Sequence, residues 1–405
     1  MKFTATLSLA ESAPAWFWRV DVENVGPEAV TLDLIYAQDM AIAPYGAIRM
    51  NEYYVSQYLD HAPLHHPQKG VMLAIRQNQA VNGQYPWCLI GSIGKAVSYA
   101  TDALQVYGFA ARADGAPIGV LEGLPNRRRQ HEHAMAALQD ERLTLLPGER
   151  AERGFFGWLE PHHADASSDA DLVFATCALD LFARSTRLPD AAVAESSSPS
   201  LFVQAPMLEV RDLDEGEHTP YFGDERRNEE REDGVLLSFF TGRRSHVVLR
   251  KKELRVLRPH GHILRTGSDW VPDEAGLTST VWMGGVFHSM VTQGHVSINR
   301  FLSTSRSYLG LFQSHGQRLF VETSAGWRLL GTPSAFEMVP EGCRWIYRHE
   351  GGVVEVRSKA ASESHELRLE CVVLEGAPVR LLLSSHVAMV GDDGVEPGPV
   401  LIEKD

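Results

Sequence analysis

The chain has 405 residues, of which 44% are hydrophobic, so it is long enough for two or three domains with sizeable apolar cores. Its formal net charge of -14 argues against a nucleic-acid partner, because such binding rests on Lys and Arg side chains that neutralise phosphates. No apolar run approaches the ~20 residues needed to span a bilayer, and the N-terminus lacks the apolar core of a signal peptide. We therefore expect a soluble, cytoplasmic protein that binds neither nucleic acid nor membrane.

Metal and cofactor motifs are missing from the sequence. Cys88, Cys177, Cys343 and Cys371 are too sparse for a disulfide framework and show no CxxC spacing, so we expect buried, reduced thiols. The histidine pairs lack the spacing of a zinc site. There is no G-x-S-x-G elbow and no glycine motif for nucleotides, so neither a metal nor an organic cofactor is expected.

The first forty residues predict a hairpin-like opening of a β-sandwich. The runs FTATLSL, WFWRVDVEN and AVTLDLIYAQD are separated by turns such as Val25-Gly26-Pro27. In the second and third runs, apolar residues recur at every other position, which gives each strand one face toward a core.

The next segment, Tyr45 to His66, combines three closely spaced tyrosines with polar side chains. Tyrosine offers a flat face and a hydroxyl, and the polar residues can hydrogen-bond a ligand. An exposed strand and turn, whose tyrosines pack on a neighbour, is an equally good interpretation. If a ligand binds here, the residues expected to contact it are Tyr53, Gln57, Asp60 and His61.

Five further strands are predicted before residue 160. They are followed by a single helix in Ser167 to Arg187, where apolar residues take helical spacing after Ser and Asp cap candidates. The small, polar segment Ala191 to Ser200 is the best linker. The predicted domains are therefore a first β-sandwich with its terminal helix (1–190), a linker (191–200), a second β-sandwich (201–390) and a tail (391–405).

In the second half, Asp212 to Asp233 carries many acids and arginines and is expected to be an exposed loop. Strand patterning resumes at Val235 to Phe240, at His246 to Leu249 and at Leu254 to Leu257. The chain closes with four more predicted strands between Cys343 and Val390.

The stretch Trp270 to Glu337 contains the most unusual chemistry. Short apolar runs alternate with Gly, Ser, Asn, Gln and Arg, which predicts a β platform with planar donors and acceptors suited to sugar hydroxyls. Tryptophan can stack on a pyranose ring, although in a sandwich it more often packs in the core. The residues of this stretch expected to contact a substrate are Trp282, Asn299, Gln317 and Arg318.

No carboxylate is singled out as a catalytic acid or base. Glycoside cleavage needs one or two such groups, and the candidates are Asp39, Glu52, Asp60, Asp269, Glu274 and Glu337. A structural acceptor role for Glu337 is favoured over a catalytic one. We therefore assign no catalytic residue.

Several segments resemble a known family. YAQDMAIAPYGAIRMNEYYVSQYLDH, RPHGHILRTG, WMGGVFHSMVTQGHVSINRFLS, SHGQRLFVE and GTPSAFEM are similar to the amino-terminal, non-barrel region of 1,2-β-oligoglucan phosphorylases of glycoside hydrolase family 94, with related stretches in cyclic β-1,2-glucan synthases. The resemblance runs from about Trp16 to Tyr347. It implies a mainly β fold of large antiparallel β-sandwich domains, of the supersandwich or galactose-mutarotase-like type, with a short helical segment.

The family cleaves a β-linked glucoside with inorganic phosphate as co-substrate, inverts the anomeric carbon and releases α-glucose 1-phosphate. Its general acid is an aspartate of an (α/α)6 barrel, and nothing in this sequence reads as the helices of such a barrel. The resemblance therefore implies a non-catalytic part that shapes a substrate cleft or dimer interface, and whether the chain alone is an enzyme stays open. Its expected partners are a β-glucan oligosaccharide and either a catalytic-barrel polypeptide or a second copy of itself.

Two other functions stay open. One is a stand-alone carbohydrate-binding protein, and the weaker one is a mutarotase-like epimerase that uses His288 or His295 with Glu337 as acid and base.

Overall fold

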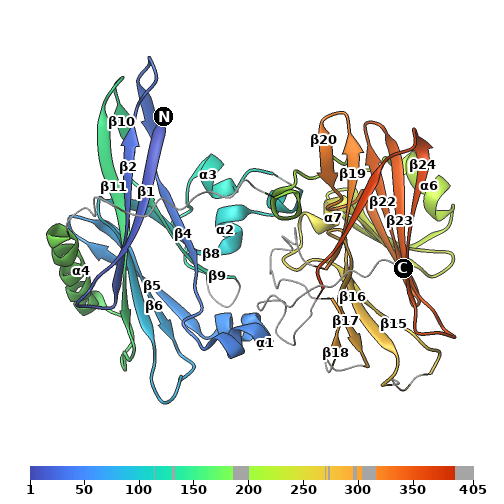
Figure 1. The fold of residues 1–405 in the computed structure, drawn as a ribbon, viewed down its shortest axis with the longest axis horizontal. Helices are drawn as coiled ribbons and strands as arrows, with labels where there is room; N and C mark the ends of the chain where they lie inside the picture. Colours follow the sequence, from blue (N-terminus) through green and yellow to red (C-terminus); the bar gives the residue numbers. More distant parts are fainter. Residues whose placement is uncertain are drawn as a thin grey trace, which may run out of the picture. The chain divides into compact units, whose positions relative to one another are not determined.

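The computed structural model describes residues 1–113, 115–129, 133–185, 200–269, 271, 274–294, 299–302 and 316–387, and for residues 45, 49–53, 203–204 and 299–300 the backbone alone. The chain forms two compact units: unit 1 is Met1–Gly108 with Ala116–Glu195, and unit 2 is Phe109–Gly115 with Ser196–Asp405. Antiparallel strands dominate both units (Figure 1), which confirms the predicted mainly β fold. The predicted domain bounds stay a prediction, because residues 186–199 and 388–405 lie outside the described residues.

Unit 1 is organised around one large sheet with the strand order β1-β2-β11-β7-β6-β8-β9-β4, and β5 pairs with β6 off this path. Its strands are β1 (Lys2–Leu9), β2 (Ala15–Glu23), β4 (Ile35–Asp39), β5 (Leu59–His66), β6 (Gly70–Gln77), β7 (Trp87–Ser92), β8 (Ala96–Asp102), β9 (Ala134–Asp140) and β11 (Arg150–Glu160). A small second sheet pairs β3 (Val30–Leu32) with β10 (Leu143–Leu145). The helices are α1 (Tyr45–Gln57), α2 (Ala103–Tyr107), α3 (Ile118–Glu122), a 3-10 turn (Asp169–Asp171) and α4 (Leu172–Arg184).

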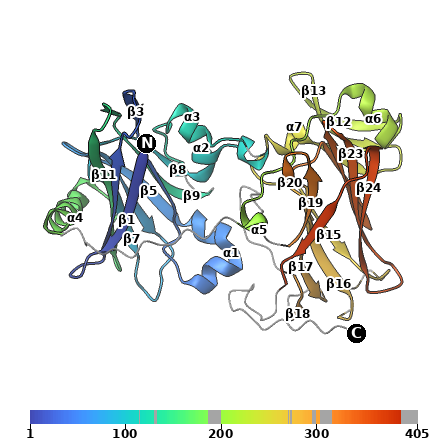
Figure 2. The same ribbon diagram turned by 45° about the horizontal axis from the view of Figure 1, so that its top comes forward.

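The two faces of the large sheet of unit 1 bury different residues, because successive side chains of a strand alternate. On one face, Phe17, Trp87 and Phe156 pack against α4, which lies along the sheet in both views (Figure 1 and Figure 2). On the other face, a second cluster includes Ile75 and Phe155. The predicted helix is thus confirmed, and its apolar stripe covers one face of the sheet.

Unit 2 contains two seven-stranded sheets, of which one has the order β12-β13-β14-β21-β22-β23-β24 and the other the order β15-β16-β17-β19-β20, with β18 on β17 and β25 on β19. The strands of the first are β12 (Arg226–Glu232), β13 (Val235–Thr241), β14 (His246–Leu249), β21 (Ala335–Val339), β22 (Gly342–His349), β23 (Gly352–Ala360) and β24 (Leu367–Gly376). The strands of the second are β15 (Gly261–Arg265), β16 (Leu277–Trp282), β17 (Val286–Gln293), β18 (Asn299–Arg300), β19 (Gln317–Thr323), β20 (Gly326–Leu329) and β25 (Leu381–Ser385). Helical turns are a 3-10 turn (Ala110–Ala113), α5 (Leu201–Gln204), α6 (Glu215–Phe222) and α7 (Arg250–Glu253).

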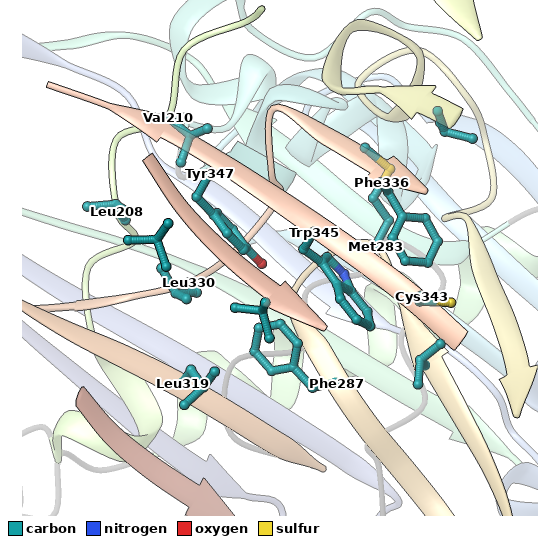
Figure 3. Close-up of a cluster of buried hydrophobic side chains, with 14 of the residues drawn as sticks. Leu208, Val210, Met283, Phe287, Leu319, Leu330, Phe336, Cys343, Trp345 and Tyr347 are labelled. Carbon is teal, nitrogen blue, oxygen red and sulfur yellow. The ribbon is translucent and has the colours of Figure 1, made fainter. Parts of the chain in front are cut away.

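The core of unit 2 lies between the two sheets. Trp345 and Tyr347 on β22 point toward Phe287 and Leu319 of the facing sheet (Figure 3). The rings of Phe287 and Trp345 are 5.0 Å apart in an edge-to-face arrangement, which suits aromatic quadrupoles. Trp345 therefore belongs to the core and cannot stack on a ligand without unfolding.

The segment after Pro44 forms a helix where the exposed-strand interpretation had placed a strand and turn. Helix α1 spans Tyr45–Gln57, and β5 follows at Leu59. Tyr54 and Tyr58 are four residues apart, and their rings pack at 5.0 Å, as neighbours on one helix face do. The sequence lacks period-2 alternation here, which is a local signal against a strand.

The expected exposed loop at Asp212 to Asp233 was also wrong. Helix α6 begins after a capping box in which Asp214 and Glu217 satisfy each other's backbone N–H groups. Strand β12 follows with an almost wholly charged sequence at the edge of its sheet. Charges on an edge strand discourage pairing with another chain, and they hide the strand from a hydrophobic pattern.

Two smaller expectations need correction. Leu254 to Leu257 form no strand; they follow the one-turn helix α7. Of the four free cysteines, Cys88 and Cys343 are buried and Cys371 is half-buried, but Cys177 on α4 is exposed.

The short segment Phe109–Gly115 belongs to unit 2 although both its flanks belong to unit 1. Its Arg112 is buried and donates hydrogen bonds of 2.7–2.9 Å to three backbone carbonyls at and after the end of α7, those of Glu253, Val256 and Leu257. Thr332 in turn donates to the carbonyl of Arg112 at 2.8 Å. A guanidinium thus satisfies carbonyls that the short helix leaves without a donor.

We predict that Arg112→Ala lowers the free energy of unfolding by about 2–4 kcal/mol, because one buried and two half-buried carbonyls lose their donor. Denaturant unfolding followed by circular dichroism measures this change. Arg142→Ala is the control, since the Arg142 side chain is 81% exposed and its loss should cost no more than about 0.5 kcal/mol. Equal stability of the two variants would contradict the structural role of Arg112.

Candidate functional site

The four predicted ligand residues of unit 1 lie on α1 and β5. Gln57 is exposed in the last turn of α1, and Asp60 on β5 accepts a 2.8 Å bond from the guanidinium of Arg128. Tyr53 is on α1, but its side chain lies outside the described residues. The structure therefore leaves Gln57 accessible and holds Asp60 in an ion pair.

His61 is buried, with only 1% of its surface exposed, on the face of β5 opposite to Asp60. Its register partner on β6 is Ile75, a member of the apolar cluster on that face. Neither ring nitrogen has a hydrogen-bond partner among the described residues. Burial lowers the pKa of His61 to about 4, so the imidazole is neutral at pH 7 and is closed to a ligand.

In unit 2, the predicted residue Gln317 on β19 lines a groove beside β17. His288 and Gln317 are register partners, and both line a cavity of about 500 Å³ whose other walls are mainly aliphatic. The Oε1 atom of Gln317 accepts no hydrogen bond from the described residues. Because a buried, unpaired acceptor on a groove-lining residue is a candidate partner for a hydroxyl donor, Gln317 is the predicted residue that the geometry supports best.

His288 lines this groove, and two serine hydroxyls contact its ring nitrogens. Its Nδ1 lies 3.0 Å from Oγ of Ser279, and its Nε2 lies 2.8 Å from Oγ of Ser358, which donates to the Phe287 carbonyl. The directions agree if Ser279 donates to Nδ1 and Nε2 donates to Ser358. Burial lowers the pKa of His288 to about 4, so the ring is neutral at pH 7, and both of its nitrogens are engaged.

Arg318, the next residue along β19, points to the opposite face and is fully buried. Its guanidinium donates 3.4 Å bonds to the carbonyls of Gly284 and Leu330, and burial lowers its pKa to about 10, so it stays charged at pH 7. Here Arg318 holds backbone together. The contact of Arg318 with a substrate stays a prediction.

Trp282 is half-buried at the end of β16. A Cβ atom on Gly261, its register partner on β15, would lie 2.7 Å from the indole, so the ring lies directly over that glycine. Asn299 on β18 is paired in register with Gln293, but its side chain lies outside the described residues, as do Trp270, His295, Gln313 and His315.

The carboxylate of Glu337 is engaged inside unit 2. It lies 2.7 Å from a guanidinium nitrogen of Arg344 and accepts a hydrogen bond from the hydroxyl of Ser245. The nitrogens of His288 are engaged with Ser279 and Ser358 instead. These contacts favour structural roles for both residues over acid–base chemistry on a sugar.

Buried carboxylates elsewhere in the described residues are also engaged. Glu355, for example, lies 3.1 Å from a guanidinium nitrogen of Arg344 and is paired with Arg357. The others with a hydrogen bond or ion pair are Asp102, Asp140, Asp171 and Glu253. Each of these carboxylates is thus held by partners from within the fold.

Among the described residues, no three His, Cys, Asp or Glu side chains gather in a way that could bind a metal ion. Within the same residues, no helix has both the length and the hydropathy to cross a bilayer.

A larger groove lies in unit 1, where the sequence had indicated only strands. It is lined by Trp16 and Trp18 of β2 and Tyr36 of β4, with a volume of about 690 Å³. The signal was present in the run WFW, because alternation places its two tryptophans on the same face of a strand.

Comparison with known protein families finds a match in each unit. Residues 1–157 match the family described as the SOGP N-terminal domain, and residues 223–398 match the glycoside phosphorylase supersandwich domain. The chain is 31% identical over 377 residues, or 92% of its length, to a 1,2-β-oligoglucan phosphorylase from Listeria innocua. It covers 33% of that protein, so it spans about a third of the length of this curated relative.

Among solved structures, a polysaccharide lyase aligns over 93% of the chain and 34% of its own, at 8% identity and a TM-score of 0.27. That likeness is too weak to carry an argument about fold or function.

The buried His288 predicts an acid-sensitive fold. Its pKa is about 4 in the folded chain and near 6.5 when unfolded, so below pH 6.5 the unfolded state binds more protons. The stability from the neutral ring is fully present above pH 6.5, and about 3 kcal/mol of it is lost as pH falls to 4. Between pH 6.5 and pH 4, the free energy of unfolding of the His288→Gln variant should therefore fall by about 3 kcal/mol less than that of the wild type.

Denaturant unfolding between pH 4 and pH 8 measures this effect. His65→Gln, which changes an exposed residue of β5, is the control and should keep the wild-type slope. A His288→Gln variant with the wild-type slope would show that His288 is not the acid-sensitive group.

Proposed function

Because the chain combines an SOGP N-terminal domain with a glycoside phosphorylase supersandwich domain, we propose that it is the non-catalytic β-sandwich part of an inverting phosphorylase acting on β-1,2-glucooligosaccharides. In this role it shapes the substrate cleft or the dimer interface of the enzyme. The observation that carries the proposal is the similarity to a 1,2-β-oligoglucan phosphorylase over 92% of the chain.

The proposed reaction needs a general acid and a site that binds the substrate. A phosphate oxygen forms a bond to the anomeric carbon on the face opposite to the glycosidic oxygen, and that oxygen leaves with a proton from a general acid. The acid must be protonated and within reach of the leaving oxygen. The described buried carboxylates are tied up in ion pairs and hydrogen bonds, which supports assigning the acid to a barrel outside residues 1–405.

Substrate binding is the demand that residues of this chain can meet. Gln317 lines a groove and carries a buried acceptor without a partner among the described residues, and Trp282 has an indole that lies over Gly261. Both belong to unit 2. The proposal assigns them to the substrate side of the enzyme, with a cytoplasmic location and phosphate as the co-substrate.

We expect the purified chain to bind β-1,2-glucooligosaccharides and to release no glucose 1-phosphate when phosphate is added. Calorimetric titration measures the binding, and a coupled assay for glucose 1-phosphate measures turnover. Release of glucose 1-phosphate by the chain alone would contradict the non-catalytic role, and absence of binding would contradict the substrate role.

A further inference from the structure

The groove of unit 1 lies where the large sheet curls on itself. β4 is at one end of the strand order, and β2 and β11 are near the other. Even so, the ring of Tyr36 on β4 stacks on Phe155 of β11 at 5.2 Å. The curl brings both ends of the sheet to one groove of about 690 Å³, which is within the range of small-molecule sites.

The aromatic floor of this groove is built rigidly. Trp16 and Phe155 pack with the apolar cluster that contains Ile75, and Trp18, the register partner of Phe155, lines the groove beside them. A Cβ atom on Gly157, the register partner of Trp16, would lie 2.0 Å from the indole. The ring of Trp16 therefore lies flat on the strand, which fixes its orientation before any ligand arrives.

Polar tips lie beside these rings. The indole N–H of Trp16 points to the hydroxyl of Tyr36 at 3.5 Å, and that hydroxyl donates to Oε1 of Gln38. Because Gln38 uses its carbonyl oxygen in this bond, its amide nitrogen remains as a donor. Burial raises the pKa of Tyr36, so the hydroxyl stays protonated at neutral pH.

The groove carries no charge. The described residues that line it are aliphatic or aromatic apart from Gln38, although the chain as a whole has a net charge of -14. A charged ligand would find no counter-ion here, whereas a neutral ligand needs none. Aromatic faces with polar tips and no charge suit a β-linked glucose unit, whose axial C–H groups make flat apolar faces and whose hydroxyls lie at the ring edge.

We infer that the groove bounded by Trp16, Trp18, Tyr36 and Gln38 binds a neutral β-glucooligosaccharide, with a sugar ring stacked on Trp18. The groove makes unit 1 a second glucan contact, separate from Gln317 in unit 2. This inference takes its ligand class from the proposed function, while the site itself rests on the groove's own chemistry.

The test is calorimetric titration of the full chain with β-1,2-glucooligosaccharides. Trp18→Ala should weaken binding to unit 1 by about tenfold or more, because stacking is lost. Trp18→Phe keeps an aromatic face and should stay within about threefold of the wild type. Trp327→Ala removes a half-buried indole of unit 2 that lines neither groove, and should bind as the wild type does.

Circular dichroism and thermal unfolding establish that each variant is folded. A folded Trp18→Ala variant with wild-type affinity overturns the inference. If Gln317→Ala abolishes all binding while Trp18→Ala has no effect, the glucan binds in unit 2 alone, so the inference fails and the proposed function stands. A wild-type chain that binds no β-1,2-glucooligosaccharide overturns both.

The free edge strand β1 also borders the groove, and its Leu7 and Leu9 are exposed, so a second copy of the chain is the competing occupant. Light scattering separates the two. Sugar binding by a monomer with an unchanged mass supports the inference. A Trp18→Ala variant that loses self-association and keeps its affinity for sugar contradicts it.

Discussion

The alternation of side chains between the two faces of a strand is the constraint on which this structure depends, because each face of each sheet must then be covered or left open. In unit 2, both faces of the central strand β22 are covered. Trp345 and Tyr347 face the second sheet, and Ile346 between them faces the cluster under α6. In unit 1, α4 covers the face that holds Phe17, and the opposite face stays partly open at β1, β2 and β4.

Covering these faces also determines which ionisable groups must be neutral or paired. A polar group that is taken out of water must be neutral or must be paired inside the fold. His288 meets this condition as a neutral ring between two serines, and Glu337 meets it through Arg344. The same side chains are the ones that acid–base catalysis would need free. The proposed role of the open faces is to bind a ligand.

Much of the fold could be predicted from the sequence, because strand alternation and the caps before α4 are local signals. The errors arose where local signals compete. The segment after Pro44 is a helix without a clear apolar stripe, and β12 is a strand made almost wholly of charges. Neither shows the periodicity that identifies its structure. The insertion of Phe109–Gly115 into unit 2 is a long-range event, since Arg112 meets its carbonyl partners about 140 residues further along the chain.

The candidate site was predicted less well than the fold, because residue type indicates what a side chain can bind but not which way it points. Gln317 and Arg318 are neighbours on one strand, yet one lines a groove and the other is wholly buried. His61 has the chemistry of a ligand residue and lies inside an apolar cluster. Trp16 and Trp18 were taken only as part of a strand, and it is the curl of the sheet toward β4 that makes them a groove.

We infer above all that the open aromatic face of unit 1 is a glucan-binding surface. A crystal structure of the chain with a bound β-1,2-glucooligosaccharide tests it most directly, because it locates the sugar without relying on a variant. We predict a pyranose ring stacked on Trp18 with its hydroxyls toward Gln38. A sugar bound elsewhere, with this groove left to solvent or to a second copy of the chain, would contradict the claim.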